Sequence, residues 1–349
     1  MTDFSTRQPV ISVVDAIAPA FKHMIAILFK PFKLVKWLKF GLVAFLMLLG
    51  TGQGANFNFN LPGDSGDRAI VAESNPFFNQ ASQWVLANLT LVIIIGALIA
   101  LLIIIIWTVF IYFGSRFTFV FLDGVVKKDV HIKQAYKENR ILSWSFFLWR
   151  IIFSPSVLLG ILLIIGIPTV LLVFAGLDKG FSLWIILAFV ALGLVLIALL
   201  VILAIIGVLT VDFVMPIMYL RRIRILEAWK IFLGMLRHNK VQFLLYLLLK
   251  AGLSLGAIML MCIPMMGLCC LVALPGAILI GIAVLAVKLP VLWALFAVGV
   301  IILMLLFNYL SQVFYLPLTI FFRTYSLVFL EGFGDEFGCI TKPIPVTTT

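Results

Sequence analysis

Long apolar stretches alternate with short basic stretches along the whole chain. A helix of about 20 apolar residues is long enough to cross the hydrocarbon core of a bilayer. Several stretches of the chain exceed this length, so the pattern predicts an all-α integral membrane protein. The apolar runs lie at about 34–50, 84–113, 146–175, 181–210 and 241–313.

The last of these runs allows two interpretations. It covers 73 residues, 241–313, and is interrupted by lysines and prolines. It holds either two long spans with a buried hairpin between them or three spans.

A basic amphipathic stretch precedes each pair of spans. Residues 11–31 contain too many polar interruptions to cross a membrane, but their apolar residues recur at helical spacing. This arrangement is typical of a helix that lies in the membrane interface. The pattern Ile-x-x-Ala-aromatic-Lys begins at Ile17 and recurs at Ile132 and at Ile225. We therefore predict three interfacial helices.

Two further sequence matches indicate an internal repeat. The repeated unit is one amphipathic helix followed by two spans, and three copies give about six transmembrane helices. In this interpretation, 276–289 is an insertion at the outer end of the third copy. The matches are Gly160-(x)6-Ile167-Pro168 with Gly256-(x)6-Ile263-Pro264, and Phe213-x-x-Pro216 with Phe314-x-x-Pro317.

The repeat defines the predicted domain organisation. Residues 1–338 form a single transmembrane domain, and 339–349 form a disordered tail. Within the domain, the segment 314–338 is a closing amphipathic piece, and 51–83 is a polar loop outside the membrane. The repeat units cover about 10–113, 114–210 and 211–313.

The distribution of basic residues predicts the orientation. The stretches 1–40, 114–142 and 219–240 hold 18 of the 25 lysines and arginines, whereas the loops at 51–83 and 176–180 hold only two. Cytoplasmic loops collect basic residues. We therefore expect both termini in the cytoplasm, with the protein in the cell (cytoplasmic or inner) membrane.

The composition excludes a soluble globular protein and a disordered one. Hydrophobic residues make up 64% of the chain and charged residues 11%, against about 25% charged in a soluble domain. The net charge of +11 is interpreted as an orientation signal and an affinity for anionic lipid, not for nucleic acid. The four cysteines match no zinc or iron–sulfur spacing, and we predict no cofactor.

Three segments resemble a family of uncharacterised prokaryotic multi-pass membrane proteins. They are LFKPFKLVKWLKFGLVAFL, GQGANFNFN and LPLTIFFRTYSLVFLEGFG. That family is similar to the membrane domain fused to some glycerophosphodiester phosphodiesterases. The resemblance implies a six-span repeat bundle in a prokaryotic cytoplasmic membrane. It implies no activity, because the phosphodiesterase is a separate soluble domain that this chain lacks.

Four ionisable residues fall inside predicted spans or at their ends, and one of them, Lys288, is interpreted as a marker of a span end. Each charge costs about 2.5–3.5 kcal/mol at mid-bilayer on insertion scales. Arg150, Asp212 and Lys250 could share the cytoplasmic leaflet and line a cavity, with Asp212 compensating the two cations. The alternative is that Arg150 and Lys250 extend to the interface, with Asp212 paired locally.

The predicted interfacial helices carry basic faces. We expect these faces to grip anionic headgroups, with the apolar faces in the lipid. The alternative is that the helices dock onto a protein partner or a second copy of the chain. The basic residues concerned are Lys22, Lys133, Lys137, Lys230 and Arg237.

No motif in the sequence specifies a reaction. Phosphate-binding loops, nucleophile elbows, HExxH and dinucleotide fingerprints are absent from it. We therefore expect a non-catalytic structural or accessory component of a membrane complex. The alternatives are a carrier or flippase-like protein for a lipid or other amphiphile, and an enzyme that acts on lipid.

Overall fold

The computed structural model describes residues 12–50, 87–179, 182–286 and 290–340. Nearly all of these residues are helical, and no strand occurs among them. The first helices are α1 (Ile17–Leu28), α2 (Leu34–Leu49), α5 (Leu89–Lys127), α6 (Ile132–Glu138), α7 (Arg140–Ile161), α8 (Ile167–Lys179) and α9 (Leu183–Leu209). They are followed by α10 (Met215–Arg221), α11 (Ile225–His238), α12 (Lys240–Ala286) and α13 (Pro290–Glu331).

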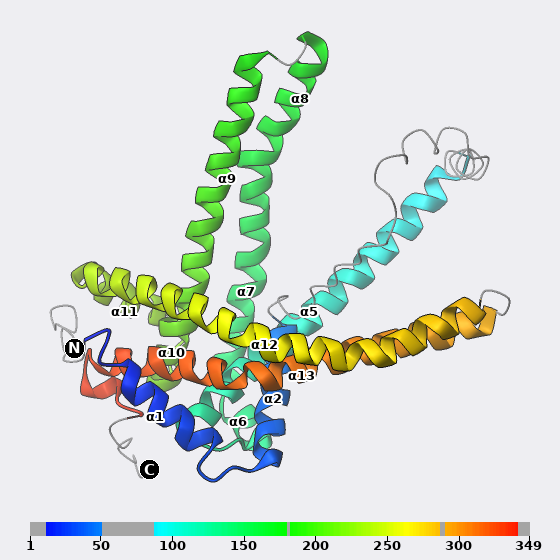
Figure 1. Cartoon of the computed structure of the whole chain (residues 1–349). Coiled ribbons are helices and arrows are strands. Elements are labelled where there is room, and N and C mark those ends of the chain that lie inside the picture. The colour runs from blue at the N-terminus through cyan, green and yellow to red at the C-terminus, as the bar shows by residue number, and fades with distance from the viewer. Residues whose placement is uncertain (1–11, 51–86, 180–181, 287–289, 341–349) are drawn as a thin grey trace.

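Long apolar helices project in different directions from one packed base (Figure 1). The hairpin of α7, α8 and α9 forms one projection, the α12–α13 pair forms a second, and the outer part of α5 forms a third. The base consists of α1, α6, α10 and α11 together with the adjoining ends of α5, α9, α12 and α13. We use "base" in this sense below.

Five helical segments in the described part of the chain are long and apolar enough to cross a membrane. In the most apolar 18 residues of each segment, only 0–11% of the residues are buried inside the protein. These side chains have no protein to cover them, so lipid is the environment that suits them. The segments are Leu89–Lys127, Arg140–Phe174, Leu183–Arg221, Lys240–Ile278 and Phe296–Glu331.

Several predicted boundaries between apolar runs and basic stretches fall inside continuous helices. The boundary predicted at 113/114 falls inside α5, which continues to Lys127. The fourth span likewise extends beyond 210 to Arg221, and most of the predicted closing segment is the end of α13. The reason is that charges on these extensions have partners inside the base, so the helices need not end where the charges begin.

Asp123 shows how the base accommodates such charges. Its side chain is only 1% exposed. The hydroxyl of Tyr219 donates a hydrogen bond to Asp123 Oδ1 at 2.6 Å, and Lys127 forms an ion pair with the same atom at 3.0 Å. A buried carboxylate with two such partners keeps its charge at little cost.

The long apolar run at 241–313 contains two continuous helices in its described residues. α12 extends without interruption from Lys240 to Ala286, and α13 begins at Pro290. The described residues therefore hold neither a buried hairpin nor a third span in this interval. Residues 276–286, predicted to be part of an insertion, are the last turns of α12.

The three short helices α1, α6 and α11 begin at the three isoleucines of the repeated pattern. These are Ile17, Ile132 and Ile225. The alanine of each pattern is at most 1% exposed. The small side chain lets each helix approach the rest of the base closely.

Much of the apolar face of α1 and of α11 packs against the base, whereas contact with lipid was predicted. The buried face of α1 packs against α13 and includes Met24 and Leu28. Phe21, an apolar residue of the same helix, is instead 52% exposed. The buried residues of α11 are Ile225, Ala228, Phe232 and Met235.

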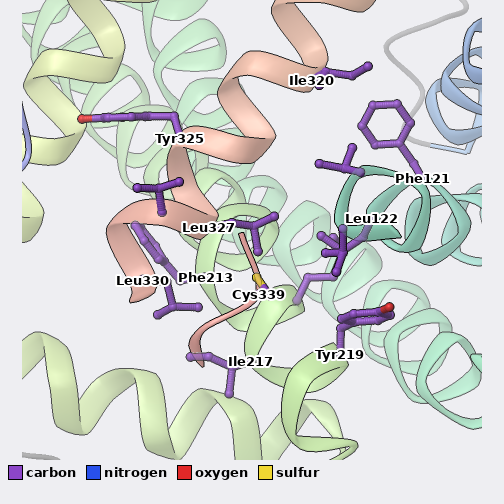
Figure 2. Close-up of a cluster of buried hydrophobic side chains, with 14 of the residues drawn as sticks. Phe121, Leu122, Phe213, Ile217, Tyr219, Ile320, Tyr325, Leu327, Leu330 and Cys339 are labelled. Atoms are coloured by element: carbon purple, nitrogen blue, oxygen red, sulfur yellow. The ribbon is translucent and has the colours of Figure 1, made fainter. Parts of the chain in front are cut away.

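Aromatic rings fill the centre of the base. The Phe213 ring lies 4.8–5.6 Å from the rings of Phe232, Phe243 and Tyr246, measured between centroids. Figure 2 shows Phe213 next to Leu327 and Leu330 of the α13 end, with Cys339 of the last described residues beside them. A side chain of this size contributes about 1.5–3 kcal/mol when fully buried, so the base is the stable part of the fold.

Helices α2 and α5 cross at a pair of glycines. A Cβ atom built on Gly50 would lie 2.2 Å from Cα of Gly114, and the reverse distance is the same. Only glycine permits this approach at either position. The crossing places the end of α2 against the inner half of α5.

Candidate functional site

A cavity of about 810 Å³ lies where the long helices leave the base. Its volume is within the range of about 300–1,000 Å³ that is typical of ligand sites. α2, α5, α7, α9, α12 and α13 all contribute to its walls, and it is partly open. Aromatic and aliphatic side chains form most of the lining, as with Trp107, Phe153 and Leu203.

Four charged residues line this cavity. They are Arg150, Asp212, Lys250 and Arg323. Each lies eight to ten residues from the base end of its helical segment, the ends being Arg140, Arg221, Lys240 and Glu331. At 1.5 Å per residue, each charge lies about 12–15 Å along its own helix from that end, and all four meet at the cavity.

Asp212 is positioned by a π-helical segment, η3 (Thr210–Val214), inserted between α9 and α10. Such wider turns are frequent at functional sites. The hydroxyl of Tyr246 donates a hydrogen bond to Asp212 Oδ2 at 3.0 Å. The ammonium of Lys250 forms an ion pair with the same oxygen, and the two side chains are 5% and 20% exposed.

The structure therefore brings two of the three sequence candidates into direct contact. Lys250 and Tyr246 lie one turn apart on α12, so one helix face supplies both partners of the carboxylate. Of the two alternatives for Lys250, pairing with Asp212 holds rather than extension to the interface.

Arg150 lines the cavity but has a different environment. Its guanidinium lies over the ring of Phe146, 5.6 Å from the centroid. Its Nη1 atom is buried and has no hydrogen-bond partner among the described residues. The cation–π contact orients the side chain without compensating its charge, so Arg150 is the unpaired cation of the site.

Arg323 is a site residue that sequence reasoning missed. It is only 6% exposed and donates a hydrogen bond from Nη1 to the carbonyl of Val211 at 2.5 Å. This contact places a third cation in the cavity, bonded to the residue that precedes Asp212. Its presence within an apolar helix is the signal that could have identified it, but the predicted boundary at 313/314 assigned it to the interface.

The five basic residues assigned to lipid or partner contact are all exposed. They lie on three separate helices, and none forms an ion pair with another described residue. Lys22 is on α1, Lys133 and Lys137 are on α6, and Lys230 and Arg237 are on α11.

Metal ligands do not cluster in the described part of the chain. No three His, Cys, Asp or Glu side chains there lie close enough together to hold a metal ion. His23, the buried histidine, instead contacts the backbone carbonyl of Val125 through Nε2 at 2.9 Å.

Comparison with known proteins identifies the family of the chain. A model described as "Family of unknown function (DUF7544)" matches residues 11–340. Curated proteins and solved structures gave no significant match. The family description names no activity and makes no connection with phosphodiesterases, so that resemblance stays a proposal. With almost its whole length matched, the chain belongs to this family of unknown function, DUF7544.

Proposed function

We propose that this protein binds the headgroup of an anionic amphiphile in the cavity and acts as a membrane carrier or holder for it, without catalysing a reaction. The observation that carries the proposal is the charge of the cavity. Three cations and one carboxylate line it in the described structure, and the carboxylate already has Lys250 and Tyr246 as partners.

The unpaired charge of Arg150 favours a bound anion. A charged group at membrane depth is expensive, and the Arg150 cation has no carboxylate beside it in the described structure. An anion bound in the cavity would compensate this charge and that of Arg323. Guanidinium groups bind phosphate and carboxylate through paired hydrogen bonds.

The cavity walls favour an amphiphile over a small soluble anion. Phe153, Leu203 and Val208 are part of its lining, next to lipid-exposed stretches of α7 and α9. An apolar chain attached to the anion would fill the rest of the cavity, and it has no polar groups that need hydrogen-bond partners there.

Second, we propose a structural or accessory role in a complex. The exposed basic residues of α1, α6 and α11 support it, since the apolar faces of α1 and α11 are already occupied by the base. These cations remain available to anionic headgroups or to an acidic partner.

We also propose six spans, built from three repeat units. Val13 and Ile340 both lie in the base, so the chain leaves the base and returns to it an even number of times. Five candidate spans lie in the described residues, and we place a sixth, outward crossing between α1 and Leu89. α2 starts this crossing. The basic base then faces the cytoplasm of a prokaryotic cell membrane.

The experiment compares lipids that copurify with the protein in a mild detergent. Lipids are extracted and quantified by mass spectrometry from the wild type, Arg150→Gln and Arg140→Gln. Arg140 is a matched control because it is an exposed arginine on the same helix. We expect anionic lipid to fall at least several-fold in Arg150→Gln only.

Equal lipid content in all three proteins would overturn the proposal. The accessory role is tested in parallel with the triple variant Lys22→Glu, Lys137→Glu and Lys230→Glu. If it keeps its bound lipid but loses a copurifying protein, the basic faces are a docking surface.

A further inference from the structure

We infer that the cavity prefers a phosphate monoester to a phosphate diester. The inference rests on the proposed function, because it names the anionic group that the cavity receives. The relevant chemistry is that of a lipid phosphate or of a soluble phosphate ester.

The charge balance of the cavity favours a monoester. Arg150, Lys250 and Arg323 oppose a single carboxylate, which leaves an excess of two positive charges among the described residues of the cavity. A phosphate monoester carries about −1.5 to −2 at pH 7, whereas a diester carries a single negative charge. The monoester neutralises the site, and the diester leaves one cation uncompensated at membrane depth.

The number of N–H donors on the two arginines also favours a monoester. Arg150 Nη1 has no hydrogen-bond partner among the described residues, and Arg323 donates to Val211 through Nη1. Each guanidinium has five N–H donors, so most of those of Arg323 are not used in this bond. Three terminal oxygens of a monoester suit this set better than the two non-bridging oxygens of a diester.

The three cations of the cavity come from three different helices, which also favours a monoester. Arg150 comes from α7, Lys250 from α12 and Arg323 from α13, and all three line the same cavity. A group with three equivalent oxygens can be approached from three helices at once. Lys250, already bound to Asp212, would then bridge the carboxylate and the phosphate.

The test uses the full chain in nanodiscs of phosphatidylcholine that contain equal mole fractions of either phosphatidic acid or phosphatidylglycerol. Bound anionic lipid per protein is measured by native mass spectrometry. At pH 8 we expect about tenfold stronger retention of phosphatidic acid. At pH 5 this preference should disappear, because the second phosphate pKa is about 6.

The variants separate this inference from the proposed function. Arg150→Gln should abolish the preference, Arg150→Lys should restore part of it, and Arg140→Gln should leave it unchanged. Circular dichroism and size-exclusion profiles establish that each variant is folded. If the wild type retains both lipids equally and in an Arg150-dependent manner, the preference is refuted while the proposed function stands. If Arg150→Gln changes nothing, both fail.

A final arm identifies the source of the phosphate. Excess glycerol 3-phosphate is added to the nanodiscs that contain phosphatidic acid. Release of the lipid would support a soluble monoester as ligand, and continued retention would support a lipid phosphate. Displacement by methyl phosphodiesters to the same extent would overturn the inference.

Discussion

The hydroxyl of Tyr325 donates a hydrogen bond to the backbone carbonyl of Val13, 312 residues earlier in the chain, at 3.1 Å. Both groups are buried in the base. This contact attaches the start of the described chain to the inner end of α13, and α1 packs on the same helix. The first and last parts of the protein are therefore held together at one end of the molecule.

Tyr325→Phe should loosen this attachment. It leaves the Val13 carbonyl without its donor, at a cost of about 1–3 kcal/mol for an unsatisfied buried group. We expect a lower melting temperature in detergent and faster proteolysis near residues 12–16. Tyr309→Phe is the control, since Tyr309 bonds the Leu38 carbonyl at an exposed position. Identical proteolysis of the two variants would show that the Tyr325–Val13 hydrogen bond does not hold the start of the described chain in place.

Gly114→Ala should be strongly destabilising. The added methyl would meet Gly50 Cα at 2.2 Å, and overpacking of this kind costs about 1–3 kcal/mol or more. Gly96→Ala on the same helix has nothing within 4 Å of the added atom and should be neutral. Thermal unfolding followed by circular dichroism gives the comparison, and equal melting temperatures would contradict the close crossing of α2 and α5.

Asp212→Asn should lower the folded yield. It removes the charged partner of Lys250 at a desolvated position, and breaking such a pair typically costs 3–5 kcal/mol. Glu227→Gln, at an exposed position on α11, serves as control. Fluorescence size-exclusion yields of the two variants decide the matter, and parity between them would show that the pair contributes nothing to folding.

His23 should make stability fall as the pH is lowered. Burial lowers the pKa of this imidazole below 6.5, so the unfolded chain binds the proton more readily than the folded protein. The contribution of neutral His23 is therefore complete above pH 6.5 and is lost as the pH falls below that value. Lys128 also lowers this pKa, whereas the Val125 carbonyl and Glu331 raise it.

Melting temperatures between pH 8 and pH 5 test this effect. The decline should be smaller in His23→Gln, which keeps a donor for the Val125 carbonyl. His131→Gln, at an exposed histidine, should decline like the wild type. An unchanged decline in His23→Gln would assign the pH dependence to other groups.

Cysteine labelling tests the orientation. In a cysteine-free background, Ser65→Cys should react with an impermeant reagent from outside intact cells, and Lys133→Cys should react only after permeabilisation. Ser143, although it lies in the predicted cytoplasmic stretch, is unsuitable because it is 2% exposed. Reaction of Lys133→Cys in intact cells would reverse the proposed topology.

The sequence allowed some of the charged residues of the cavity to be predicted, but not Arg323. Depth in the membrane placed Asp212 near Arg150 and Lys250, and the structure shows the ion pair with Lys250. Arg323 was missed because a proline and nearby polar residues look like the end of a span. In the structure, α13 continues past Pro317 to Glu331, and the base supplies the partners that a membrane would not.

The faces of the short helices show a second limit. Helical periodicity identified α1, α6 and α11, but it cannot distinguish a surface that contacts lipid from one that contacts protein. Phe21 is apolar and exposed, whereas His23 is polar and buried. Only the tertiary contacts of α1 with α13 decide which side of the helix is covered.

The π-helical segment η3 fixes how α10 is rotated about the helix axis relative to α9. Each residue of an α-helix turns the chain by about 100°, and a π turn accommodates one extra residue. Asp212 within η3 faces the cavity, while Tyr219 on α10 contacts Asp123 on the inner side of the base. Deleting one residue from η3 would rotate α10 by about 100° relative to α9, so that only one of the two acids could keep its partners. The wide turn thus couples the rotational setting of the lipid-exposed helix to that of the packed base.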